Sequence, residues 1–273
     1  MLHEKKIAIL GCGNIGSAIA DGIAKTESVK NSDVYLTRRK AENLQKYADK
    51  GFNITSDNKE AVKNSEILIL GITPQQMDSL MAEIKDELVE GKHVIYSIVS
   101  GATIEQIKSK IEKNVTVLRV MPNLALAIQQ SMTCISGEDN ESEEIRVAKE
   151  LFDKMGKTII IEENLMVPAT ALVACGIAFF MRAIRAASQG GIEIGFHSEE
   201  ALVMSAQTAL GAAQLLLTEE AHPESEVDKV TTPRGCTIVG LNQMEHSGFS
   251  SSLIKGIVMS AEKAETLYNG KNK

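Results

Sequence analysis

Short runs of apolar residues alternate with amphipathic stretches over roughly the first 160 positions of the chain. Apolar runs that predict strands lie at residues 7–10, 33–37, 67–72, 94–99, 115–121, 132–136 and 158–162. Between them, apolar residues recur at helical spacing at residues 17–25, 41–50, 76–89 and 143–154, and Thr103-Ile104-Glu105-Gln106 has the capping-box pattern that opens another helix. This alternation predicts repeated βαβ units and a mainly parallel sheet.

The pattern changes after about residue 163, where β-branched runs give way to sequence rich in Ala, Leu, Met and Gly. We therefore expect an α/β Rossmann-type doubly wound sheet domain over residues 1–162 and an all-α domain over residues 163–273. The stretch 167–194 is too apolar for a solvent-covered helix, so it is either a central core helix or a subunit interface. A homodimer or higher homo-oligomer built on the C-terminal helices follows as a hypothesis.

Composition narrows the class of protein. The chain has 273 residues, of which 44% are apolar and 24% charged, as in ordinary globular proteins. A formal net charge of -7 argues against a general nucleic-acid binder, which needs a basic surface. By inspection, no apolar run approaches the roughly 20 residues that a membrane span needs, so we expect no membrane-spanning helix. The N-terminus leads into a predicted strand rather than into the apolar segment of a signal peptide. We expect a cytoplasmic protein with no nucleic-acid and no membrane partner.

The cysteines and histidines do not suggest a metal site. Cys12, Cys134, Cys175 and Cys236 are scattered, without a CxxC pattern and without zinc-ligand spacing, so reduced thiols are the better interpretation. His197 and Glu200 lie three positions apart, which fits the start of a surface helix better than a ligand pair. We expect no metal.

A glycine-rich loop, Gly11-Cys12-Gly13-Asn14-Ile15-Gly16, directly follows the first predicted strand. In such a loop Gly11 permits the tight turn, Gly13 lets a pyrophosphate approach the backbone, and Gly16 lets the helix pack closely on the strand. The helix N-terminus presents N–H groups and a partial positive charge to phosphates. A merely structural turn is the alternative, but the strand–loop–helix context favours a dinucleotide site.

The end of the second predicted strand indicates which dinucleotide binds. NAD binders usually place an Asp or Glu there, about 20 residues past the loop, to hold the ribose 2′-OH. This chain has Leu36-Thr37-Arg38-Arg39-Lys40 instead, with cations and no carboxylate. Thr37 with Arg38 or Arg39 offers a hydroxyl and a guanidinium to a 2′-phosphate, and the alternative is a solvated basic start to the next helix. We predict NADP(H) as the preferred cofactor, with NAD(H) possible.

Several segments at matching intervals resemble the pyrroline-5-carboxylate reductase family. In the first half they are the GCGNIGSA loop, Asn58 within SDNKE, and residues 71–75, 97–101 and 119–123. In the helical half they are His222-Pro223, Asp228-Lys229-Val230, and residues 231–238 followed by Gly240-Leu241 and Met244-Glu245. The spacing from His222 to Thr237 makes the match specific.

The resemblance implies an activity and a set of site residues. The activity is NAD(P)H-dependent reduction of 1-pyrroline-5-carboxylate, a cyclic imino acid, to L-proline. Beyond the phosphates, the cofactor would be lined by Asn58, Ile72, Thr73, Pro74, Ile98, Val99 and Ser100, with Met121, Pro122 and Asn123 on the nicotinamide side. Glu220, Cys236 and Thr237 would contact the substrate.

The segment Thr232-Pro233-Arg234-Gly235-Cys236-Thr237 suits a substrate that carries a carboxylate. A proline-initiated turn at a helix start would expose the N–H groups of Gly235, Cys236 and Thr237, and the Thr232 hydroxyl adds a donor. Thr237 is the expected catalytic residue, bonding the imine nitrogen or holding a water that does. An ordinary helix start is the alternative. Cys236 is expected to fill space, since hydride transfer needs no covalent intermediate, and Glu220 either orients substrate or is an ordinary surface acid.

The chain departs from the family pattern around the expected substrate pocket. The family usually has SPGGTT or SPGGAT at residues 232–237, so Arg234 replaces a glycine and either strengthens the carboxylate cradle or points to solvent. Residues 174–179, ACGIAF, stand in place of a GSGPAF-like run, and Leu124-Ala125 replaces Thr-Pro. The cofactor interpretation is unaffected by these changes.

Two other functions compete with this interpretation. A β-hydroxyacid dehydrogenase, or another imine reductase, would share the architecture. Such dehydrogenases rely on a lysine in the long helix after the Rossmann domain, and this chain has none between Lys157 and Lys229. A non-catalytic NADP(H)-binding regulator is the alternative from another class, and the departures in the substrate pocket are the features that favour it.

Overall fold

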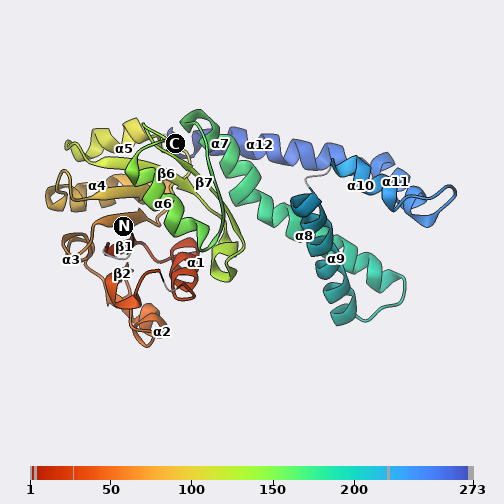
Figure 1. Cartoon of the computed structure of the whole chain (residues 1–273), viewed down its shortest axis with the longest axis horizontal. Helices are drawn as coiled ribbons and strands as arrows, with labels where there is room; N and C mark the ends of the chain where they lie inside the picture. The colour runs from red at the N-terminus through yellow and green to blue at the C-terminus, as the bar shows by residue number, and fades with distance from the viewer. Residues whose placement is uncertain (1, 3–4, 27, 220–221, 270–273) are drawn as a thin grey trace. The chain divides into compact units, whose positions relative to one another are not determined.

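The computed structural model describes residues 2, 5–26, 28–219 and 222–269, and these form two compact units (Figure 1). The first unit is Met1–Cys175 with Ser260–Lys273, and the second is Gly176–Met259. The last helix begins in the second unit and ends in the first. Each unit is described by itself.

An eight-stranded sheet in the order β3-β2-β1-β4-β5-β6-β7-β8 forms the centre of the first unit. Its strands are β1 Ile7–Leu10, β2 Val34–Thr37, β3 Asn53–Thr55, β4 Ile67–Leu70, β5 Val94–Ser97, β6 Thr116–Met121, β7 Ser131–Ser136 and β8 Gly156–Ile160. The described pairs are parallel except β6 with β7, which is antiparallel. The chain order reverses between β1 and β4, the point at which doubly wound sheets bind ligands.

Helices cover both faces of this sheet, because successive strand residues point to opposite sides. Ile7 and Ile9 join the apolar cluster of α1 Asn14–Ile23, α2 Gln45–Ala48 and α6 Glu143–Asp153, whereas Ala8 and Leu10 join that of α3 Asn58–Lys63, α4 Met77–Ile84 and α5 Ile104–Ile111 (Figure 1). The expected Rossmann-type doubly wound architecture is therefore confirmed.

The strands expected from apolar runs all form, with ends shifted by a few residues. The run 67–72 stops as a strand at Leu70, and Gly71 then packs against the glycine loop. The capping box is confirmed: Thr103 Oγ1 accepts the Gln106 N–H at 3.1 Å, and Gln106 Oε1 accepts the Thr103 N–H at 2.9 Å. The short edge strand β3 was not predicted, since its half-exposed residues carry no apolar run.

Two predicted helices are interrupted by tight turns. The stretch 41–50 begins as a 3₁₀ turn over Ala41–Leu44 before α2, and the stretch 76–89 consists of α4 between 3₁₀ turns at Pro74–Gln76 and Lys85–Glu87. Further 3₁₀ turns lie at Asn31–Asp33, Leu124–Ile128 and Glu163–Leu165. The amphipathic spacing therefore predicted where these helical regions lie, but it did not predict the 3₁₀ turns at their ends.

The compact units divide at a different place from the predicted boundary between residues 162 and 163. Helix α7, Met166–Ala169, and a π-helix over Thr170–Cys175 follow that boundary. Met166, Ala169 and Val173 nevertheless pack into one apolar cluster with Met121 and Cys134 of the sheet. Helical sequence thus begins near residue 163, while the contacts of its first turns remain with the sheet.

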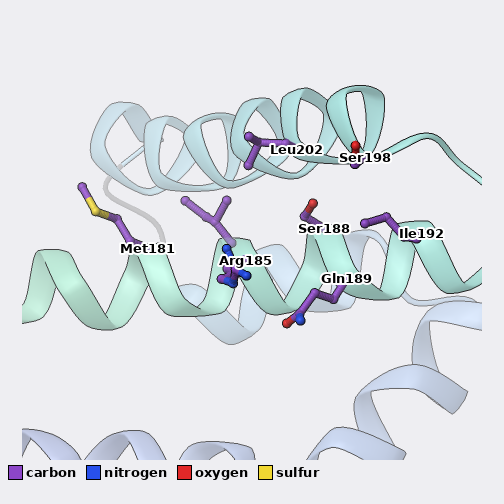
Figure 2. A pocket seen from close by; sticks show the side chains of 8 residues that line it. Met181, Arg185, Ser188, Gln189, Ile192, Ser198 and Leu202 are labelled. Carbon is purple, nitrogen blue, oxygen red and sulfur yellow. The ribbon is translucent and has the colours of Figure 1, made fainter.

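The second unit is all-α, as expected. Its helices are α8 Gly176–Glu193, α9 Ser198–Glu219, α10 Pro223–Lys229, α11 Cys236–His246 and α12 Phe249–Asn269, the last of which continues into the first unit. Helices α8 and α9 approach closely, since a Cβ on Gly191 would lie 3.0 Å from Cβ of Ala201. Figure 2 shows a pocket between these helices, lined by Met181, Ser188 and Ile192 from α8 and by Ser198 and Leu202 from α9.

Large apolar side chains remain exposed on these helices. Phe180, Val203 and Val239 are 60%, 68% and 66% exposed. Together with the other exposed apolar residues of α8, α9, α11 and α12, they leave these helices with more apolar surface than a solvated face usually carries. For α8, it favours the subunit-interface alternative over a central core helix.

Among the residues that the structure describes, two helices are long and apolar enough, by length and composition, to cross a membrane. Glu163–Glu193 has a mean hydropathy of 1.9 and Ser198–Thr218 one of 1.4. The expectation that no stretch reaches this length was therefore wrong, because small residues make long apolar helices without a conspicuous run of large ones. The core helices of soluble proteins pass the same test.

Candidate active site

The glycine loop is built by backbone contacts that admit no side chain. Gly11 has a φ of 97°, and a Cβ on it would lie 2.6 Å from Cγ2 of Ile72 and 2.9 Å from the carbonyl oxygen of Gly71. A Cβ on Gly16 would lie 2.5 Å from the carbonyl oxygen of Gly11, and a Cβ on Gly71 would lie 2.6 Å from the same oxygen. The loop, the start of α1 and the end of β4 are thus in direct backbone contact.

Gly13 faces open space instead. It caps α1 without a side-chain hydrogen bond, and no described atom lies within 4 Å of a Cβ built on it. The first N–H groups of a helix have no partner within the helix, so those of Asn14, Ile15 and Gly16 are available to an anion. An open glycine beside unpaired N–H groups fits the pyrophosphate of a dinucleotide.

Cys12 lies in the same loop but points into the core. Its N–H donates to the carbonyl oxygen of Thr37 at 2.8 Å, and burial raises the pKa of its thiol to about 12. The side chain is a neutral space-filler under ordinary conditions.

A hydrogen-bond chain connects the loop with two later elements. Thr37, at the end of β2, is 2% exposed; its hydroxyl accepts the Gly11 N–H at 3.1 Å and donates to Asn58 Oδ1 at 2.6 Å. Asn58 Nδ2 in turn donates to the Glu83 carboxylate oxygens at 3.0 and 3.1 Å. The Thr37 hydroxyl is engaged within the protein, so it holds the loop rather than offering a donor to a phosphate.

Asn58 is positioned by the residue before it. Asp57 caps α3, with its carboxylate accepting the N–H groups of Lys59 at 2.8 Å and Glu60 at 3.3 Å. Asn58 therefore begins the helix with its side chain beside the end of β2.

Arg38 and Arg39 follow Thr37 and are exposed. Among the described residues, neither takes part in an ion pair with a carboxylate. Their guanidinium groups are available beside the Thr37–Asn58 contact, where the sequence predicts a 2′-phosphate.

The other predicted cofactor residues lie after neighbouring parallel strands. Ile72, Thr73 and Pro74 follow β4, and Ile98, Val99 and Ser100 follow β5. The carboxyl ends of β1, β2, β4, β5 and β6 share one edge of the sheet. Ile98 and Val99 are buried, so these positions offer backbone more than side chains, while Ser100 is half-buried.

Asn123 ties the end of β6 to the π-helix. Met121 and Pro122 before it are buried. Asn123 Oδ1 accepts the Ala125 N–H at 3.1 Å, and Nδ2 donates to the carbonyl oxygen of Val173 at 3.5 Å. π-helical turns often occur at functional sites, and this contact places one beside the strand end predicted to face the nicotinamide.

An ion pair between a buried arginine and a partly exposed glutamate lies behind that strand end. The side chain of Arg119 on β6 is 3% exposed, and its Nη1 lies 3.6 Å from Glu163 Oε1, which also accepts the Ile104 N–H at 2.7 Å. Burial lowers the pKa of Arg119, and its Nη2 has no hydrogen-bond partner among the described atoms. The pair joins β6, the start of α5 and the first helical turn after the sheet.

The predicted substrate segment forms a tight turn in the second unit. The Gly235 N–H donates to the carbonyl oxygen of Thr232 at 2.9 Å, and Arg234 has a φ of 62°. This is the pattern of a type II turn, whose third position favours glycine. A Cβ on Gly235 would lie 2.4 Å from Thr232 Oγ1 and 3.0 Å from the carbonyl oxygen of Thr232, so a larger residue there would force the turn or the Thr232 side chain to shift.

Helix α11 begins directly after this turn. Gly235 caps it without a side-chain bond, which leaves the N–H groups of Cys236 and Thr237 without partners in the helix. Thr232, Cys236 and Thr237 are exposed. The expectation that the Gly235 N–H is free was wrong, because the turn itself uses it.

The structure brings the predicted cofactor residues to one edge of the first unit, and the turn 232–237 belongs to the second unit. Glu220 lies outside the described residues. Sequence reasoning missed Glu83, for which no local signal exists, and the role of Arg119, for which a charged residue inside an apolar strand was the available signal. None of the described residues form a group of three or more His, Cys, Asp or Glu able to hold a metal.

Two family models match the chain. One, described as pyrroline-5-carboxylate reductase dimerisation, matches residues 163–267. The other, described as NADP oxidoreductase coenzyme F420-dependent, matches residues 6–101. The first begins where the helical sequence was expected to begin.

Similar proteins extend over nearly the whole chain. Pyrroline-5-carboxylate reductase 1 of Dictyostelium discoideum is 48% identical over 99% of this chain, which spans about half (51%) of that relative's length. Pyrroline-5-carboxylate reductase 2 of the same organism is 46% identical over 99% of this chain and 96% of its own. The crystal structure of Plasmodium falciparum pyrroline carboxylate reductase with NADP bound has a TM-score of 0.90 at 22% identity, covering 98% of this chain and 100% of that one.

Proposed function

This chain belongs to the pyrroline-5-carboxylate reductase family, and we propose that it reduces 1-pyrroline-5-carboxylate to L-proline with NADPH. The observation that carries the proposal is 46% identity to a named reductase over 96% of that relative's length. The geometry of the glycine loop agrees with it, because Gly13 and the start of α1 offer an open anion site at the carboxyl edge of the sheet.

The cofactor site is proposed as follows. The bound dinucleotide supplies the hydride. The N–H groups at the start of α1 hold its pyrophosphate, and Arg38 and Arg39 hold the 2′-phosphate that distinguishes NADPH. Thr37 keeps the loop in shape through Gly11. The remaining predicted residues line the edge of the sheet, with Asn123 at the end predicted to face the nicotinamide.

The substrate site is proposed at residues 232–237. The N–H groups of Cys236 and Thr237 and the hydroxyl of Thr232 cradle the carboxylate, and Gly235 gives the turn its shape. The Thr237 hydroxyl bonds the imine nitrogen, directly or through a water, which favours the protonated imine that accepts hydride. Glu220 is retained as a residue that orients the substrate.

A homo-oligomer is supported by the match to the dimerisation model, and we propose a homodimer through the C-terminal helices. The exposed side chains of Phe180, Val203 and Val239 would be covered there. A strict monomer in sedimentation would contradict this. A cytoplasmic location remains part of the proposal.

The proposed activity is tested by following NADPH absorbance with purified full-length chain, with and without pyrroline-5-carboxylate. NADPH loss should depend on the imine, and a small hydroxy acid with NADP⁺ should give none. Tight NADPH binding without turnover would favour the non-catalytic regulator. Thr237→Ala should lower the rate of NADPH oxidation, and Thr231→Ala, as the control, should not. If Thr237→Ala oxidised NADPH as fast as the parent chain, Thr237 would not contact the reacting nitrogen.

A further inference from the structure

Glu83 lies near the C-terminal end of α4, and its carboxylate reaches a neighbouring helix. Both of its oxygens accept from Asn58 Nδ2, at 3.0 and 3.1 Å. Glu83 is exposed and forms none of the ion pairs found among the described residues. A negative charge without a cationic partner is therefore held against the Asn58 amide.

Asn58 lies beside the end of β2, where the proposed cofactor site places the adenosine ribose. In dinucleotide-binding folds the end of the second strand handles the ribose 2′ position. Thr37 occupies that end, and its hydroxyl donates to Asn58 Oδ1 at 2.6 Å. Because Oδ1 accepts from Thr37, Nδ2 is the amide donor that remains, and both of its bonds go to Glu83.

We infer that Glu83 is a specificity-determining residue that weakens the preference for NADPH and allows NADH to be used. The inference rests on the proposed cofactor site. A 2′-phosphate must share the Asn58 amide with the carboxylate and experiences its charge, while NADH has no phosphate at this position. The acidic residue that NAD binders carry at the end of the second strand is supplied here from α4.

Two opposed groups would then set the cofactor preference. Arg38 and Arg39 attract the 2′-phosphate from the end of β2, and Glu83 repels it from the other side of Asn58. The balance between them gives a modest preference for NADPH rather than an absolute one.

The test is the ratio of dissociation constants for NADH and NADPH, measured by the fluorescence of the reduced nicotinamide without any imine. Glu83→Gln keeps an acceptor for Asn58 and removes the charge. It should raise the ratio Kd(NADH)/Kd(NADPH) by roughly fivefold, with an unchanged melting temperature. Asp86→Asn removes an exposed charge just beyond α4 and should leave the ratio unchanged.

An unchanged ratio in Glu83→Gln, or a ratio that moves equally in Asp86→Asn, would overturn the inference. Its failure is distinguishable from failure of the proposed reaction, because binding is measured without substrate. A chain that forms proline but shows no change in the ratio refutes only the role of Glu83. A chain that binds both cofactors, shifts the ratio and forms no proline refutes only the reaction.

Discussion

The hydroxyl of Thr37 accepts a hydrogen bond from the Gly11 N–H at 3.1 Å, which ties the end of β2 to the first glycine of the cofactor loop. The same hydroxyl donates to Asn58. The shape of the loop and the position of the Asn58 side chain thus depend on one buried side chain.

Replacing Thr37 by Val removes both hydrogen bonds at nearly constant volume. The half-buried Gly11 N–H would lose its partner, at a cost of about 1 kcal/mol. We expect the Kd for NADPH to rise about tenfold in fluorescence titration, and Thr37→Ser to retain most of the affinity. Equal affinity in Thr37→Val and the parent chain would show that the loop holds its shape without this contact.

Replacing Arg38 and Arg39 together by Ala should raise the KM for NADPH far more than that for NADH, because only NADPH carries the 2′-phosphate. We expect a change of about tenfold or more for NADPH in steady-state assays. Lys30→Ala, at the amino end of the same strand region, is the control. Equal effects on the two cofactors would mean that these cations do not hold a phosphate.

The Arg119–Glu163 pair should contribute to stability. Glu163→Gln keeps an acceptor for the Ile104 N–H but leaves the buried guanidinium without its counter-charge. We expect a loss of about 1–2 kcal/mol in the free energy of unfolding by urea, discounted because Glu163 is partly exposed. Glu162→Gln, next to it and exposed, should cost little, so equal losses in both variants would contradict the role of the pair.

His93 should make stability depend on pH. Its imidazole is buried, its Nδ1 accepts the Val89 N–H at 2.8 Å, and burial lowers its pKa from the ordinary value of 6.5. Between the lowered and the ordinary value the unfolded chain binds more protons, so stability falls as pH drops through that window. His93→Asn should flatten this part of the urea-unfolding profile, and His246→Asn, at an exposed site, should not. A profile unchanged in His93→Asn would contradict the assignment.

Two substitutions in the turn before α11, Arg234→Gly and Gly235→Ala, should have opposite effects on stability. Arg234 occupies a left-handed conformation that costs a non-glycine residue about 1 kcal/mol, so Arg234→Gly should leave stability unchanged or slightly raised. Gly235→Ala places a Cβ 2.4 Å from Thr232 Oγ1 and should lower the melting temperature and raise the KM for the imine. Destabilisation by Arg234→Gly with no effect of Gly235→Ala would mean that the turn differs from the one described.

The features that could be predicted from the sequence are those that depend on residues close together in the chain. Gly11 and Gly16 could be assigned from the spacing of the loop, because the need for glycine arises within a few residues of backbone. The layers followed from the alternation of strands and helices. Arg234 was noticed as a replaced glycine, and its φ gives the physical reason that glycine is usual there.

What could not be predicted depends on contacts between distant elements. Thr37 was assigned to a phosphate, but its hydroxyl serves Gly11 and Asn58. The Asn58–Glu83 bond joins residues 25 positions apart and leaves no periodic signal. Met166 and Val173 pack against the sheet, so the first compact unit extends beyond the boundary predicted after residue 162. Composition shows where helical sequence begins, but it does not show which element a helix packs against.

The most direct test of the proposed reaction is the fate of the hydride. The chain is incubated with pyrroline-5-carboxylate and NADPH deuterated at the transferable position of the nicotinamide, and the product is analysed by mass spectrometry. The proposal predicts proline carrying one deuterium, on the former imine carbon, in an amount equal to the NADPH oxidised. NADPH that stays bound and unoxidised, with no labelled proline, would contradict it.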